Sequence, residues 1–216
     1  MTFPTHRAFA IGWILLGSMF LYANGMTEIN YFLAMIIMLQ IGKYGALFPD
    51  IDHNWKNVKD KTVPNWVINK VIHITGGKHR SWQTHSLDIA LVFIFFSATL
   101  PQTLLDMEKI SEVNEEVLKI VMLSFSLGWL SHLFSDMLTS AGVRLFFWKS
   151  RKIALVPKEL FGIRFNTGNE WENFVYKTTK VINFIIGLIA ILYPFIVTGA
   201  IYSPNDMLHI VLGGKI

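Results

Sequence analysis

The chain has 216 residues, of which 52% are hydrophobic and only 16% are charged, and its mean hydropathy is +0.43. Soluble domains carry about 25% charged residues, so this composition favours a membrane protein. Cysteine is absent, which excludes disulfides and thiolate metal ligands. The net charge of +4 comes without a phosphate-binding loop or a DNA-binding helix pair, so no nucleic-acid partner is expected.

Five apolar stretches approach the length of a membrane-crossing helix, about 17–25 residues. They cover residues 8–23, 29–48, 86–105, 117–135 and 181–202. The first is short enough to be the hydrophobic region of a signal peptide, but only Arg7 precedes it and Asn24-Gly25-Met26 is a poor cleavage site, so we expect it to be retained. The sequence therefore predicts an all-α integral membrane protein with about five transmembrane helices, forming a single domain over residues 1–216.

The Lys and Arg residues divide unequally between the two sides that these spans define. Fifteen of the 19 fall on the side of the N-terminus, whereas Lys109 and Lys215 fall on the other side, and Lys43 and Lys119 lie within or at the edge of spans. Positive residues concentrate in cytoplasmic loops. We therefore predict a cytoplasmic N-terminus and two long cytoplasmic loops, residues 49–85 and 140–180.

Three segments of these loops have recognisable patterns. Residues 65–75 carry apolar side chains near helical spacing before Gly76-Gly77, which predicts a short helix at the membrane interface. The aromatic residues 146–148 stand among basic ones, as is typical of the headgroup level. Residues 153–165, which include Pro157 and Gly162, predict a hairpin.

Six of the seven histidines fall on the side of the N-terminus, whereas His209 falls on the other side, and several carboxylates accompany them there as candidate metal ligands. These candidates are His6, Asp50, Asp52, His53, His79, His85, His132, Asp136 and Glu170. Several histidines with several carboxylates favour zinc, manganese or iron, in a mononuclear or dinuclear site, over magnesium or calcium. Because the candidates flank different spans, their convergence predicts one divalent metal site, with zinc as the first expectation.

Each group of candidates also has a simpler interpretation. His132 and Asp136 lie one helical turn apart and could bind one cation, or could form a hydrogen bond at a helix end. Pro49 should end the second span at Asp50, and the acidic turn that follows could merely be solvated. His6, just before the first span, could equally be an interfacial histidine.

The start of the third span adds a candidate cation and two further histidines. His79 and His85 flank this region, and Asp88, one turn after His85, could orient its ring. Arg80 would suit an anionic oxygen such as that of a phosphoryl group, although pairing with a lipid headgroup is an alternative.

These residues belong to four ordered motifs that resemble the YdjM family of bacterial inner-membrane metal-dependent hydrolases. The motifs are Thr5-His6, residues 48–53, His79-Arg80 with Thr84-His85-Ser86, and residues 128–143. Lys78 and Ser81 replace glycines that are usual in the family, and Trp148-Lys149 stands for the family's Trp-Pro. The resemblance implies a multi-pass protein of the bacterial cytoplasmic (inner) membrane with a metal centre and an unsettled substrate. Residues 167–170 resemble the family's Gly-and-Glu element, which makes Glu170 a candidate ligand or base.

These features predict a membrane-embedded metal-dependent hydrolase that acts on a membrane-proximal ester, either a phosphoester or another lipid ester. The metal would lower the pKa of bound water, Asp52 or Glu170 would relay the proton, and Arg80 would bind the anionic substrate. Membrane lipid is the expected partner. Residues 1–142 would supply the metal-site helices, 143–180 a cytoplasmic loop and 181–202 the final span.

Two other classes of protein use the same residues. One is a non-enzymatic membrane metal-binding or transport protein, which should place polar groups near the middle of the membrane, where Lys43, Asp88 and Asn183 are the few candidates. The other is a structural scaffold in which the polar residues tie helix ends together.

Overall fold

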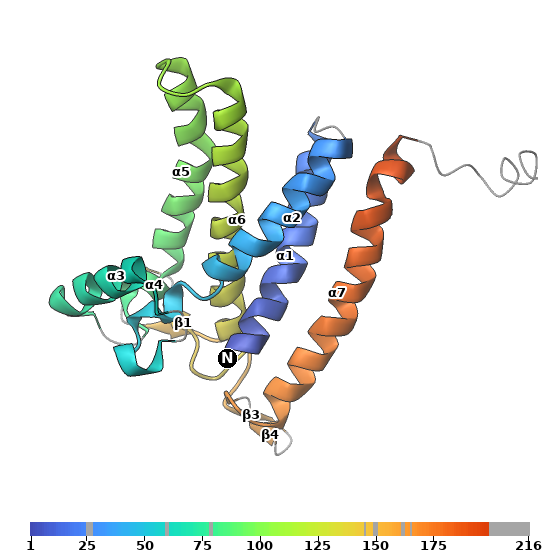
Figure 1. Cartoon of the computed structure of the whole chain (residues 1–216). Coiled ribbons are helices and arrows are strands. Elements are labelled where there is room, and N and C mark those ends of the chain that lie inside the picture. The colour runs from blue at the N-terminus through green and yellow to red at the C-terminus, as the bar shows by residue number, and fades with distance from the viewer. Residues whose placement is uncertain are drawn as a thin grey trace, which may run out of the picture.

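Five long helices dominate the computed structural model of the chain (Figure 1). The structure describes residues 1–24, 28–58, 61–77, 80–144, 146–148, 151–160, 163–164 and 166–198. The long helices are α1 (Phe3–Ala23), α2 (Glu28–Gly45), α5 (Leu87–Asp106), α6 (Glu112–Met137) and α7 (Glu170–Val197). Each belongs to a stretch that is long and apolar enough to cross a membrane, so the predicted all-α membrane fold is confirmed.

Two of these helices begin earlier than hydropathy predicts. Helix α1 starts at Phe3, where Pro4 occupies the first turn, a position that tolerates proline because its missing N–H would be unpaired there. Helix α7 starts at Glu170, within the predicted loop, because the Asn169 side chain caps it by accepting a hydrogen bond from the Glu172 amide. The end of the predicted last span, after residue 198, lies outside the described residues.

Helix α6 organises the bundle, since it packs against α1, α2 and α5, while α7 packs against α1. Glycines permit its close approach to α2. A Cβ atom on Gly128 would overlap the carbonyl oxygen of Gly42, and one on Gly45 would overlap that of Phe125. Small residues of this kind let the backbones of membrane helices touch.

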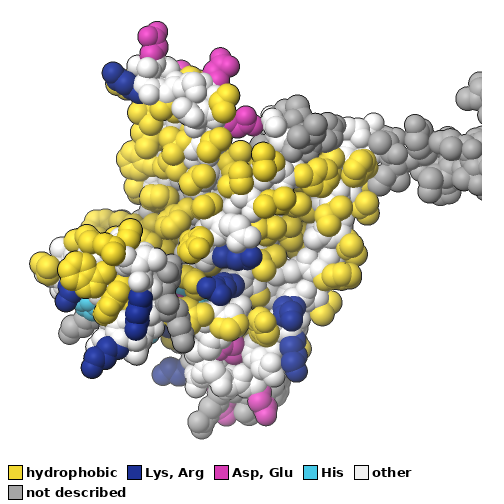
Figure 2. All heavy atoms as spheres, viewed as in Figure 1, with side chains coloured by type: hydrophobic (Ala, Val, Ile, Leu, Met, Phe, Trp, Pro, Cys, Tyr) yellow, Lys and Arg dark blue, Asp and Glu magenta, His cyan; other side chains and the backbone are white. Residues whose placement is uncertain are grey.

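The outer faces of the long helices form an apolar belt (Figure 2). Phe95 of α5 is 62% exposed and Phe184 of α7 is 68% exposed. Lys and Arg side chains gather toward the end of the bundle that holds the N-terminus, and acidic side chains lie at the turn between α5 and α6. An exposed apolar band between polar ends is the surface of a protein embedded in lipid.

The short elements cluster at the end that holds the N-terminus, which is called the site end below (Figure 1). They are the 3₁₀ helices η1 (Pro49–Asp52) and η2 (Trp55–Asn57), helices α3 (Val63–Ile74) and α4 (Trp82–His85), and the antiparallel pairs β1 (Val143–Arg144) with β2 (Lys152–Ile153) and β3 (Glu159–Leu160) with β4 (Ile163–Arg164). The helix predicted at 65–75 and a hairpin within 153–165 are thus confirmed. The interfacial position of α3 stays a prediction, although Val63 and Ile74 are largely exposed.

Candidate metal centre

Helix α6 carries two buried polar residues into the site end. His132 and Asp136 lie one turn apart on this helix, and both are at most 1% exposed. The Nε2 atom of His132 is 3.8 Å from Oδ2 of Asp136. Burying an imidazole and a carboxylate on one helical face requires further partners, because an uncompensated buried charge is costly.

Helix α1 supplies the first of these partners from its opening turn. The ring of His6 stacks on that of His132 with centroids 3.7 Å apart. Its Nε2 atom is 3.7 Å from Oδ1 of Asp136 and 3.9 Å from Oδ2 of Asp50. The Met1 amino group also forms a buried ion pair with Asp136, at 2.5 Å.

The 3₁₀ helix η1 contributes Asp50. Helix α2 ends at Gly45, and Pro49 then opens a tight 3₁₀ turn that directs Asp50 toward the end of α6. Oδ1 of Asp50 is 3.9 Å from Nε2 of His132. Asp50 is buried, so the acidic turn is not simply solvated.

The four-residue helix α4 completes the group with His85, which is 2% exposed. Its Nε2 atom lies 3.3 Å from Nε2 of His132 and 3.8 Å from Oδ2 of Asp136. His6, Asp50, His85, His132 and Asp136 therefore converge from four separate elements, and they are called the His/Asp cluster below.

The outer nitrogen of each histidine faces a hydrogen-bond acceptor. Nδ1 of His132 donates to the carbonyl oxygen of Ala46 at 2.7 Å. The Ser135 hydroxyl donates to the His132 carbonyl, so its oxygen accepts from Nδ1 of His6 at 2.6 Å. Nδ1 of His85 is 3.1 Å from Oδ2 of Asp52. These bonds place the ring proton on Nδ1 and direct the Nε2 lone pairs into the cluster.

This arrangement fits a divalent metal. Two Nε2 lone pairs only 3.3 Å apart repel each other unless a cation or a shared proton lies between them. Nitrogens bound to one tetrahedral zinc, each about 2.0–2.1 Å from it, lie roughly 3.3–3.4 Å apart. Two overlapping sets of possible ligands, His6 with His132 and Asp136, and Asp50 with His85 and His132, each bring their ligand atoms within 4.8 Å of one another. Imidazole with carboxylate is a ligand set of zinc, manganese and iron.

Asp52 lies behind His85, on the side of the outer nitrogen. It is fully buried, and its Oδ2 accepts hydrogen bonds from the Thr84 hydroxyl at 2.6 Å and from the Ser81 amide at 3.1 Å, as well as from His85. A carboxylate bonded to the outer nitrogen of a ligand histidine fixes the orientation of its ring. Asp88, predicted for this role, instead accepts from the amides of Ile89 and Phe147, so that prediction was wrong.

Two of the predicted residues lie at the rim of the cluster. His53, which is 29% exposed, has its Nε2 atom 3.6 Å from Oδ1 of Asp50. The guanidinium of Arg80, which is 16% exposed, lies 3.2 Å from Oδ2 of Asp136. Arg80 has a φ of 59°, a conformation uncommon for a residue with a side chain, and such strain concentrates at functional sites.

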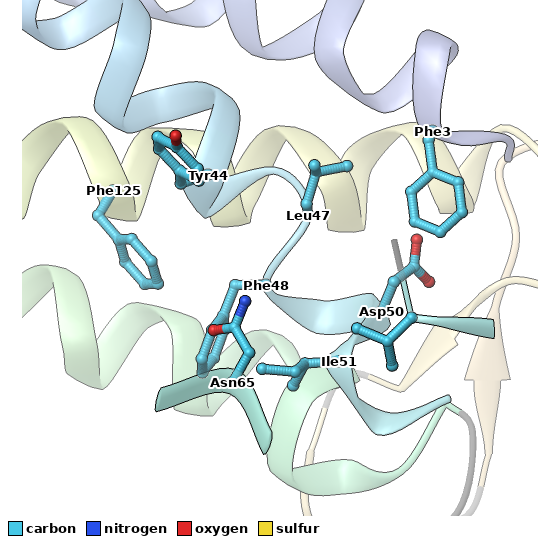
Figure 3. Close-up of a pocket in the computed structure, with 9 residues that line it drawn as sticks. Phe3, Tyr44, Leu47, Phe48, Asp50, Ile51, Asn65 and Phe125 are labelled. Carbon is cyan, nitrogen blue, oxygen red and sulfur yellow. The ribbon is translucent and has the colours of Figure 1, made fainter. Parts of the chain in front are cut away.

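A small cavity of about 70 Å³ opens beside Asp50 (Figure 3). Its lining is mostly apolar and comes from α1, α2, η1, α3, α6 and the segments between them: Phe3, Tyr44, Leu47, Phe48, Asp50, Ile51, Val58, Asn65 and Phe125. Asp50 is the one carboxylate in this lining, so the cavity brings apolar surface directly to a residue of the His/Asp cluster.

The remaining candidate residues lie either apart from the His/Asp cluster or outside the residues that the structure describes. His79 and His209 lie outside the described residues. Glu170 is exposed on the first turn of α7, so its role as ligand or base stays a prediction. The buried carboxylate near this point is Glu172, which accepts hydrogen bonds from Thr2, from the Thr5 hydroxyl and from the Gly168 amide.

Sequence reasoning missed Glu172 and the partners of the outer nitrogens. Glu172 resembles any acidic residue in the first turn of a helix, where the helix dipole favours it. Ser135 and the Ala46 carbonyl carry no signal of their own, because a serine in an apolar helix usually bonds to its own backbone.

The comparison with protein families agrees with this architecture. The profile of the YdjM inner membrane proteins matches residues 1–204. The chain belongs to the YdjM inner membrane protein family. No curated protein and no solved structure gives a significant match. This YdjM protein thus belongs to an inner-membrane family and has a buried His/Asp group that could hold a metal ion.

Proposed function

We propose that the protein is a metal-dependent hydrolase of the bacterial inner membrane, acting on a membrane-proximal phosphoester of a lipid. The observation that carries this proposal is the orientation of three histidines whose Nε2 atoms converge on Asp50 and Asp136 while their Nδ1 atoms are bonded outward. A divalent metal held there would supply a water of lowered pKa and an electrophile for the ester oxygen.

The residues of the chain supply the rest of the chemistry. His6, His85, His132, Asp50 and Asp136 would hold the ion. Asp52 fixes the His85 ring, and Arg80 offers a cation beside Asp136 where a negatively charged oxygen can be stabilised. The apolar cavity at Asp50 would receive the acyl side of the substrate and exclude water from that side of the ester.

The position of the cluster favours an enzyme over a transporter. Transport sites lie near the middle of the membrane, between the two ends of the bundle. Here the candidate ligands come from the first turns of α1, from η1 and α4, and from the last turns of α6, all at the site end. A site at the end of the spans meets lipid headgroups, where phosphoesters are found.

The test is metal analysis and turnover of the purified full chain in detergent. We expect bound zinc, manganese or iron, and chelator-sensitive hydrolysis in a panel of phospholipids and soluble phosphodiesters. Asp136→Asn should abolish turnover, whereas His73→Ala, which alters an exposed histidine of α3, should not. Tightly bound metal without turnover on any substrate would favour the metal-binding membrane protein, and absence of metal would favour the structural scaffold.

A further inference from the structure

The β1–β2 pair brings two basic residues of the second loop to the His/Asp cluster. Arg144 and Lys152 are directly opposite each other in the antiparallel pair, so their side chains share one face of the ribbon. The neighbouring Val143 is 2% exposed and packs in the core with Trp129 and Leu133. Alternation along the strand therefore directs Arg144 away from that core.

Backbone contacts fix this ribbon against the elements that carry the cluster. Arg144 forms a β-bridge with Ser86, the residue after His85. The amide of Leu155, just after β2, donates to the carbonyl oxygen of Met137, the residue after Asp136. Both ends of the ribbon are thus tied to residues adjacent to the cluster.

Arg80 joins Arg144 and Lys152 in one basic group. The pKa of Lys152 is lowered by its partial burial and by the positive charges of Arg80 and Arg144, while Asp136 opposes this effect. Arg80 and Lys152 thus both interact with one carboxylate, Asp136, which already belongs to the His/Asp cluster. Like charges held close together are unfavourable unless an anion joins them.

Arg144 also has unused hydrogen-bonding capacity. Its Nε atom is buried and donates to no residue that the structure describes. A buried donor without a partner is costly, and planar guanidinium groups suit phosphate oxygens in particular. The requirement for an anion and the free donor thus occur in the same group of residues.

We propose that Arg80, Arg144 and Lys152 form a subsite for a phosphate group, set beside Asp136 so that a phosphoester bound there meets the His/Asp cluster. This inference rests on the proposed hydrolase function and deepens it by assigning the recognition of the anionic group to the β1–β2 ribbon. A lipid headgroup and free inorganic phosphate present the same chemistry. The experiment therefore needs an arm for each.

The first arm measures binding of inorganic phosphate to the metal-loaded full chain in detergent by calorimetry. Arg144→Gln should weaken binding roughly tenfold, since a hydrogen bond between charged groups is lost, and Lys152→Gln roughly threefold, because this lysine is more exposed. Lys158→Gln, an exposed lysine of the same loop, is the matched control and should bind as the wild type does. Lys152→Gln alters an exposed side chain, so a change in its phosphate affinity would not reflect misfolding. The metal content should stay unchanged in every variant.

The second arm measures hydrolysis of phosphatidylglycerol presented in vesicles, with and without added inorganic phosphate. We expect inorganic phosphate to compete with the lipid substrate. We also expect Arg144→Gln and Lys152→Gln to raise KM for the lipid more than they lower kcat. If inorganic phosphate binds at these residues but does not inhibit lipid hydrolysis, the subsite does not hold the phosphate group of a lipid. Wild-type phosphate binding in both variants would overturn the subsite even if hydrolysis occurs, whereas weakened binding without any lipid turnover would leave the subsite standing and count against the hydrolase.

Discussion

The outer nitrogen of each buried histidine determines what its inner nitrogen can do. In His6, His85 and His132, hydrogen bonds to a hydroxyl, a carboxylate and a carbonyl oxygen hold the proton on Nδ1. The inner lone pairs then face two carboxylates, while the two cations next to the cluster, the Met1 amino group and Arg80, both pair with Asp136. Metal binding follows from this pattern more directly than from the presence of histidine alone.

The paired residues of α6 should therefore bind metal as a unit. We expect His132→Ala and Asp136→Ala each to lower metal affinity by at least about 10–100-fold. Removing a residue that only hydrogen-bonds to a metal ligand already causes a loss of this size. Dialysis against a metal buffer followed by elemental analysis measures this. His73→Ala is the matched control, and equal metal content in all three variants would favour the scaffold.

Asp52 provides a second test at this scale. If it positions His85, Asp52→Asn should lower metal affinity by about 10–100-fold, while Asp88→Asn should leave it unchanged. Unchanged metal affinity together with a fall in kcat of about 10²–10⁴-fold would instead favour the proton relay that the sequence predicts for Asp52.

The sequence predicted Asp88 as the carboxylate that orients His85, but the structure places Asp52 there. This difference shows a limit of reasoning from the spacing of single residues. Spacing of one turn brings side chains together only within a continuous helix. Helix α4 ends at His85, and Ser86 has an extended backbone, with φ −109° and ψ 141°, before α5 begins. The turn between His85 and Asp88 is therefore broken, and Asp52, distant in sequence, takes the position behind the ring.

At the scale of elements, the contact between α2 and α6 holds η1 against the end of α6. Gly128→Ala would place a methyl group against the carbonyl oxygen of Gly42 and the amide of Ala46. Overpacking of this kind costs about 1–3 kcal/mol of stability. We expect a lower thermal midpoint in detergent and weaker metal binding, because Asp50 would move relative to His132.

Gly187→Ala is the matched control for this substitution. It also adds a methyl group to an apolar helix, but the new atom would meet only Leu15 at an ordinary contact distance of 3.8 Å. Equal stability of the two variants would argue against the close contact of α2 and α6.

Sequence patterns predicted the long elements better than the short ones. Hydropathy located the five apolar stretches, because length and apolarity are properties of each segment by itself. It placed the start of α7 too late, because the first turns of this helix carry Glu170 and Glu172 and depend on the Asn169 cap. The pairing of β1 with β2 depends on tertiary contacts with Ser86 and Met137, which no local pattern records.

For the whole molecule, the charge asymmetry predicts orientation. The chain has no cysteine, so single cysteines can report on each loop. In intact cells, cysteines at Asn57 and Lys158 should resist a membrane-impermeant thiol reagent, whereas one at Asn114 should react. Reaction at Asn57 and Lys158 with protection at Asn114 would place the site end on the outer side of the membrane.

The origin of the His/Asp cluster in four elements links metal supply to stability. An ion held by α1, η1, α4 and α6 would act as a cross-link that exists only in the folded chain, so its binding energy adds to the free energy of unfolding. At a free metal concentration about 100 times Kd, this contribution is about 2.7 kcal/mol. The short elements η1 and α4, which lack the extensive helix contacts of the bundle, would loosen first under chelation. Metal scarcity would therefore expose the loop of residues 49–85 to proteolysis before the long helices separate.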